Sequence, residues 1–134
     1  MTDIVTLWRA GQLPIEDGVF YADGRSYAVD VVDGDLVVAE EFDLGLLLAE
    51  DPDWLTTIDI TREAGASPGS VCGGEGSHGS EGFFARLNAD GGLVWVCYLS
   101  EANPVDTLVV SNGKLTVTTT SGVSITVDVD DPVG

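Results

Sequence analysis

Residues 107–127 read TLVVSNGKLTVTTTSGVSITV, and this stretch decides the fold class. Asn112-Gly113 is the strongest short signal for a tight hairpin turn, because both residue types accept the left-handed backbone that such a turn requires. The turn predicts two facing apolar pairs on one side of the hairpin: Val110 with Leu115, and Leu108 with Val117.

The second turn in this stretch has two possible lengths. A two-residue turn at Ser121-Gly122 would place Ile125 opposite Thr118 and mix apolar with polar side chains. A three-residue loop over 120–122, with Gly122 left-handed, keeps the apolar residues on one face. We therefore predict the longer loop, which gives two further facing pairs: Ile125 with Val117, and Val127 with Leu115.

Outward from this stretch, similar patterns recur along the chain. Asp-Gly pairs at 23–24 and 33–34 each predict a two-residue hairpin turn, and residues 89–92 separate strands expected at 83–88 and 93–99. Thr56 to Ile60 is another expected strand. The turn at 33–34 predicts two apolar pairs on one face: Val31 with Leu36, and Val29 with Val38.

Two short helices complete the pattern. Ile4, Leu7 and Trp8 form a helical stripe that Thr2 can cap and Gly11 can end. Residues 41–50 predict a second helix, with Glu40 and Glu41 at its positive end. The expected fold is a single α+β domain over residues 1–134, a mainly antiparallel β-sheet meander with about nine strands and two short helices.

Residues 69–82 interrupt the alternating pattern. Six of these fourteen residues are glycine, with serine, histidine and glutamate between them. We expect a long loop here, and long loops in compact domains are usually functional or disordered.

Charge is the most informative part of the composition. The chain has 5 Lys and Arg against 23 Asp and Glu, a formal net charge of −18, and residues 1–66 hold 15 of the acids. Such a protein repels phosphate groups, so we expect it to bind neither nucleic acid directly nor anionic membrane surfaces. Two interpretations remain: a solvated acidic surface, or a surface shaped to occupy a cationic site on a basic protein.

The start of the chain has no basic stretch followed by an apolar run, so we expect a cytoplasmic protein. In that compartment Cys72 and Cys97 are expected as free thiols. Arg86 and Trp95 should be cross-strand neighbours, forming a packed cation–π pair.

No residue pattern indicates catalysis or a cofactor. The glycine-rich stretch lacks the Gly-Lys-Ser/Thr ending and the positive charge of a phosphate loop. Ser77 or Ser80 beside His78 seldom has the geometry of a nucleophile and base. Cys72, His78 and Cys97 lack the paired spacing of a zinc site, and the aspartates at 30, 33 and 35 lack the acid that closes a calcium loop. We expect no enzyme, no metal and no cofactor.

The run GFFARLNADGGLVWVCYL at 82–99, followed by Glu101-Ala102-Asn103-Pro104, resembles the central hairpin of bacterial immunity proteins. These small antidotes are encoded beside deaminase-type and related toxins of polymorphic toxin systems. The resemblance covers residues 82–112 and lies in a packing pattern. It implies a non-enzymatic cytoplasmic inhibitor that binds one cognate toxin tightly.

The resulting hypothesis is an immunity protein that blocks the basic nucleic-acid-binding or active-site cleft of a toxin domain. Two alternatives stay open: a small-ligand or peptide-binding module with residues 69–82 as a lid, and a hydrolase that uses His78. The candidate toxin-binding residues lie in the glycine-rich stretch and in the acidic turns of the first half: Glu75, His78, Glu81, Asp33, Asp35, Glu40 and Glu41.

Overall fold

The computed structural model describes residues 3–133, which form two helices and eleven strands. The elements of the first half are α1 (Ile4–Arg9), β1 (Gln12–Pro14), β2 (Gly18–Tyr21), β3 (Ser26–Val32), β4 (Asp35–Glu41), α2 (Leu44–Glu50) and β5 (Leu55–Ala66). Those of the second half are β6 (Gly69–Gly76), β7 (Gly82–Leu87), β8 (Leu93–Leu99), β9 (Val105–Ser111), β10 (Lys114–Thr119) and β11 (Ser124–Asp128).

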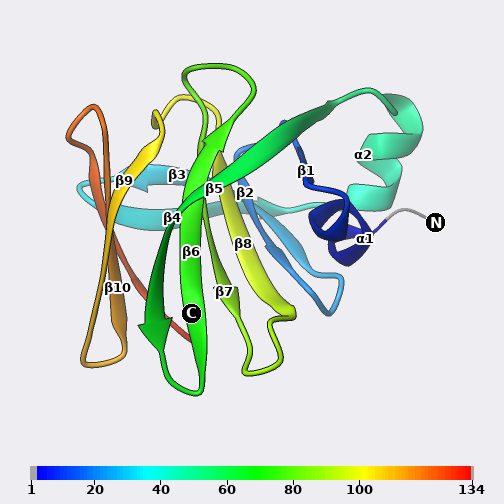
Figure 1. Ribbon diagram of the computed structural model, residues 1–134. Coiled ribbons are helices and arrows are strands. Elements are labelled where there is room, and N and C mark those ends of the chain that lie inside the picture. Colours follow the sequence, from blue (N-terminus) through cyan, green and yellow to red (C-terminus); the bar gives the residue numbers. More distant parts are fainter. Residues whose placement is uncertain (1–2, 134) are drawn as a thin grey trace.

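The strands form two antiparallel sheets. The large sheet has the order β1-β5-β6-β7-β8-β2-β3-β4, and the small sheet has the order β11-β10-β9. The large sheet therefore contains two meanders, joined where β8 pairs with β2. The small sheet lies on one side of the large sheet and α1 and α2 lie on the other (Figure 1). This arrangement confirms the expected α+β class dominated by antiparallel sheet.

The β7–β8 hairpin is buried on both faces of the large sheet. Phe84, Trp95 and Cys97 belong to the core shared with the small sheet, whereas Phe83 and Tyr98 belong to the core covered by the two helices. Successive side chains of a strand point to opposite faces, so this one hairpin contributes to both cores.

The register of the short hairpins confirms the sequence analysis. β9 and β10 pair Val110 with Leu115 through a turn in which Asn112 and Gly113 both have positive φ. The loop before β11 has three residues with Gly122 left-handed, and Ile125 lies opposite Val117. The predicted pairs of the β3–β4 hairpin and the remaining predicted pairs of the small sheet are also present: Val31 with Leu36, Val29 with Val38, Leu108 with Val117, and Val127 with Leu115.

Other local predictions need correction. Residues 22–24 form a three-residue loop, because Tyr21 N–H donates to the carbonyl of Arg25. The second helix begins at Leu44 with Asp43 as its cap, and Glu40 and Glu41 lie in β4 instead. Asp3 caps α1, and the predicted cap Thr2 lies outside the described residues. The strand expected at Thr56 to Ile60 extends to Ala66.

The prediction of a loop over residues 69–82 is wrong for most of its length. Residues 69–76 form β6, a strand paired with β5 on one side and β7 on the other. The glycines serve close backbone packing: a Cβ at Gly74 would overlap the carbonyl oxygen of Asp59, next to an irregularity in the β5–β6 register. Only residues 77–81 remain as a turn before β7.

The two cysteines and Arg86 occupy buried positions. Cys72 and Cys97 are free thiols that belong to different cores, on opposite faces of the large sheet. Burial raises the pKa of Cys72 to about 12. Arg86 lies opposite Trp95 as predicted, but its guanidinium donates to the carbonyl of Ala66 and lies 3.8 Å from Asp130.

We predict that Gly74→Ala lowers the free energy of unfolding by about 2 kcal/mol or more, because the added methyl group overlaps the backbone of β5 at Asp59. Gly79→Ala is the matched control, since nothing lies within 4 Å of a Cβ at that exposed turn position. Urea denaturation of both variants measures the difference, and equal stability of the two would contradict the close-packing role of Gly74.

Candidate functional site

A pocket of about 530 Å³ lies between the β3–β4 hairpin, the start of β11 and the segment that follows β8. The β3–β4 turn reaches this position because the Gly34 carbonyl accepts a hydrogen bond of 2.9 Å from Thr126 N–H. The walls combine carboxylates with aliphatic side chains, and the lining residues are Asp17, Val29, Asp30, Val31, Asp33, Gly34, Leu99, Glu101, Ala102, Val123 and Ser124.

Four carboxylates line the pocket, and its lining contains no lysine, arginine or histidine. Asp17 is held by Ser100 N–H, which donates to its Oδ1 at 2.7 Å. In the described part of the chain, the structure gives the exposed carboxylates of Asp30, Asp33 and Glu101 no hydrogen bond or ion pair. These three charges therefore remain available to a cationic group.

The arrangement suits a cation carried on an aliphatic chain. A lysine or arginine side chain has an apolar stem and a charged head, and carboxylates form charge-assisted hydrogen bonds with either head group. Val29, Val31 and Leu99 supply an apolar wall for such a stem. We call this pocket the acidic pocket.

The predicted acidic residues of the first half lie along the same hairpin but not in one place. Asp33 lies in the acidic pocket, whereas Asp35 lines a separate hollow with Lys114 and Asp128. Glu40 and Glu41 lie farther along β4, opposite Ala28 and Tyr27 of β3. The contact of these residues with a partner stays a prediction.

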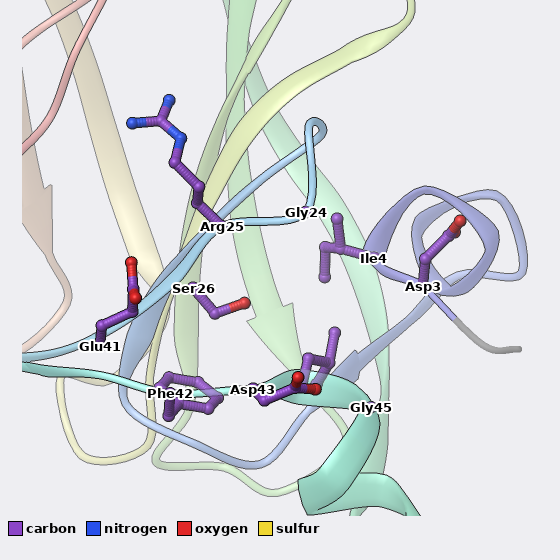
Figure 2. Close-up of a pocket in the computed structure, with 10 residues that line it drawn as sticks. Asp3, Ile4, Gly24, Arg25, Ser26, Glu41, Phe42, Asp43 and Gly45 are labelled. Carbon is purple, nitrogen blue, oxygen red and sulfur yellow. The ribbon is translucent and has the colours of Figure 1, made fainter.

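Glu41 also lines a second pocket of about 570 Å³, formed by the β2–β3 turn, the start of α1 and the start of α2 (Figure 2). Its other charged groups already have partners within the chain. Asp43 accepts from Leu46 N–H at 3.1 Å, and Arg25 pairs with Asp23 at 2.9 Å and lies over the ring of Tyr21. Figure 2 shows the Arg25 side chain directed away from Asp43.

The three candidates of the glycine-rich stretch do not form an exposed loop. Glu75 lies in β6 and is half-buried, and the His78 side chain is 66% exposed in the turn. Glu81 is only 2% exposed, so the hypothesis that it inserts between cations of a partner is wrong. Residues 69–76 are paired on both sides, so they are also not a lid.

Glu81 instead organises a buried polar network. Its Oε1 accepts from Thr56 Oγ1 at 3.0 Å and from His78 N–H at 2.8 Å, and it lies 3.0 Å from His78 Nδ1. Its Oε2 accepts from the hydroxyl of Tyr98. Gly76 makes room for the carboxylate, since a Cβ there would overlap Glu81 Oε1. The network links β5, the 77–81 turn and β8.

The network holds Glu81 in its charged form. Burial acts to raise its pKa, but the hydrogen bonds from Tyr98, His78 and Thr56 outweigh burial and lower the pKa below its usual value. Thr56 Oγ1 lies 2.9 Å from Ser77 Oγ, and both hydroxyls belong to this structural arrangement. The described contacts of Ser77 and His78 thus join them to Thr56 and Glu81, and none of them pairs His78 with a serine nucleophile.

The sequence analysis missed Asp17 and Glu101, and it considered Asp30 only as part of a calcium loop, which it rejected. Asp17 and Glu101 come together because β2 pairs with β8, where Gly18 lies opposite Tyr98. That pairing joins segments about eighty residues apart in the chain, and no turn signal announces it. Only the net acidity of the first half pointed toward this region.

No family model, curated protein or solved structure matches the chain. The resemblance of residues 82–112 to immunity proteins therefore stays a prediction. Within residues 3–133, no helix has the length and apolar character needed to cross a membrane. The same residues contain no group of three or more His, Cys, Asp or Glu side chains that could hold a metal ion.

We predict that Glu81→Gln lowers the free energy of unfolding by about 1–3 kcal/mol at neutral pH, because the amide cannot accept all the hydrogen bonds that the carboxylate accepts. Since the folded-state pKa of Glu81 is lowered, the stabilisation is present above about pH 5 and is lost as the pH falls through the folded-state pKa. The difference from wild type should therefore shrink below about pH 4.

Urea denaturation at several pH values measures this difference. Glu75→Gln serves as the control, because it makes the same chemical change at a half-buried carboxylate to which the structure assigns no hydrogen bond within the described residues. A deficit in Glu81→Gln that stays constant from pH 7 to pH 3 would show that the charge of Glu81 is not what stabilises the fold.

Proposed function

We propose that this protein binds a basic protein partner through the acidic pocket and the adjoining β3–β4 hairpin. The observation that carries the proposal is the pocket lining, which has four carboxylates, no cationic side chain and an aliphatic wall. Electrostatic attraction steers a basic partner toward such a surface, and burial of the aliphatic parts stabilises the complex once formed.

We further propose that the partner is a toxin domain acting on nucleic acid and that the protein is its cytoplasmic, non-enzymatic immunity protein. A toxin that binds nucleic acid needs a basic cleft, and a chain with a net charge of −18 competes for that cleft. The resemblance of residues 82–112 to immunity proteins supports the same role. This support does not depend on the charge argument, since the β7–β8 hairpin is buried and carries little of the charge.

The β3–β4 hairpin favours this role over a module that encloses a small ligand. The acidic pocket opens beside a hairpin whose Val31, Val32 and Val37 are at least 37% exposed, a surface that suits contact with another macromolecule. The segment suggested as a lid is β6, which is held on both sides by neighbouring strands.

The test uses the toxin domain that this proposal expects the neighbouring open reading frame to encode. We expect Asp30→Asn/Asp33→Asn/Glu101→Gln to weaken its binding at least tenfold, because three unpaired carboxylates of the acidic pocket are neutralised. The asparagine at position 33 keeps the turn, since it accepts the positive φ of 51° found there. Isothermal titration calorimetry at low and physiological salt measures the loss.

The control variant is Glu50→Gln/Asp51→Asn/Asp53→Asn, which makes the same change in net charge at exposed positions at the end of α2 and just beyond it. It should bind nearly as tightly as wild type. Equal weakening by both variants would show that binding depends on the net charge of the chain and not on the acidic pocket. Binding that depends neither on salt nor on either variant would refute the electrostatic proposal.

A further inference from the structure

The two edges of the large sheet differ in how they are protected. At one edge, β1 has three residues and ends in Pro14, which cannot donate a backbone hydrogen bond. At the other edge, β4 has seven residues and its only paired strand is β3, while β11 lies beside the start of β4, where Thr126 N–H donates to the carbonyl of Gly34. A long edge strand presents unpaired backbone groups that another strand can bind, so proteins usually shorten or cover such edges.

The backbone pairing shows which groups of β4 are open. Val29 N–H donates to the carbonyl of Asp17, on the side of β3 away from β4, so the facing pair of Val29 and Val38 is not hydrogen-bonded. Hydrogen-bonded and non-hydrogen-bonded pairs alternate in antiparallel sheets. The pair of Val31 and Leu36 lies two positions along, so it is also not hydrogen-bonded. The N–H and C=O groups of Leu36 and Val38 point away from β3, and residues 3–133 supply no other hydrogen bond to them.

The side chains around these groups are apolar and acidic. Val37 is 45% exposed and Val38 is 41% exposed, and they lie on opposite faces of the strand. Asp35 and Val37 share one face with Asp30, whereas Leu36 and Val38 share the other face. A strand added beside β4 would thus meet carboxylates on one face and aliphatic side chains on the other.

A second copy of this chain fits the edge poorly, because each copy carries a net charge of −18 and the register centred on Val38 also sets like charges opposite one another. If two β4 strands paired about a two-fold axis at Val38, Asp35 of each would lie opposite Glu41 of the other. Like charges directly opposite one another destabilise a strand pair. Charge complementarity favours a partner segment that carries cations where this chain carries carboxylates.

We propose that β4 binds an extended segment of the basic partner as an added antiparallel strand, with lysine or arginine alternating with aliphatic residues. Backbone hydrogen bonds to Leu36 and Val38 hold the segment. Its cations face Asp30 and Asp35, and its aliphatic side chains continue the face of Leu36 and Val38. This inference rests on the proposed function, because it specifies how the basic partner binds.

Two synthetic peptides of equal charge test the added strand: acetyl-KVKVKVK-amide, which can extend a sheet, and acetyl-KPKPKPK-amide, in which proline replaces the valines whose N–H groups would face Leu36 and Val38. We expect the first to bind at least tenfold more tightly to the wild-type chain in calorimetry. In spectra of the ¹⁵N-labelled protein, that peptide should protect the amides of Leu36 and Val38 from hydrogen exchange.

Val38→Pro removes the open N–H and should reduce binding of the valine peptide at least tenfold, whereas Val38→Thr keeps both the N–H and the β-branched shape and should bind normally. Circular dichroism checks the folding of each variant. The amide protection of wild type provides a second readout that does not depend on the proline variant.

The outcomes separate this inference from the proposed function. Equal binding of both peptides, with no protection of Leu36 and Val38, overturns the added strand while leaving electrostatic binding of a basic protein in place. If the free protein dimerises and Val38→Pro abolishes the dimer, the edge binds a second copy of this chain, and the inference is also overturned. Binding of the valine peptide that survives Asp33→Asn/Glu101→Gln but not Val38→Pro supports the strand and counts against the pocket.

Discussion

The structure depends on the burial of one hairpin, β7–β8, on both of its faces. Aromatic side chains leave this hairpin in both directions, with Trp95 toward the small sheet and Tyr98 toward the helices. Neither face can be left to water, because each carries large apolar area. The small sheet and the two short helices are the covers that this constraint requires, and the remaining strands extend the large sheet sideways from the hairpin.

The same constraint determines where polar groups can lie. Trp95 satisfies its indole N–H with the carbonyl of Val129 at 3.0 Å, which draws the segment after β11 over the core. Tyr98 satisfies its hydroxyl with Glu81. Buried polar groups thus find partners inside the fold, while unpaired carboxylates lie at the surface, among them those of the β3–β4 hairpin and beside it. The division between a satisfied interior and an unsatisfied acidic surface underlies the functional proposal.

The accuracy of the sequence analysis followed the range of the interaction involved. The turn at Asn112-Gly113 and the loop ending at Gly122 were predictable, because a turn and the alternation beside it are encoded within a few residues. β6 was not, because glycine is common both in flexible loops and in strands whose neighbours approach closely. Only the position of Asp59 against Gly74 distinguishes the two cases.

The candidate site was predictable only in outline. The acidity of the first half directed attention to Asp33, which lines the acidic pocket and whose contact with a partner stays a prediction. Glu81 looked like an exposed charge in a polar segment, and the sequence contains no sign that Tyr98 and Thr56 surround it. Glu101 and Asp17 join the pocket through the pairing of β8 with β2, which depends on the order of strands in the whole sheet.

The carboxylates along β4 have a consequence for how this protein can change during evolution. They flank a valine-rich strand with open backbone groups, and such strands assemble into aggregates when nothing repels their copies. Under the proposed function, each acid beside the edge serves two selections at once: affinity for a basic partner and mutual exclusion among identical chains. A lineage that lost its partner would still be under pressure to keep these charges, so the acidity of this hairpin should outlast the interaction that it serves.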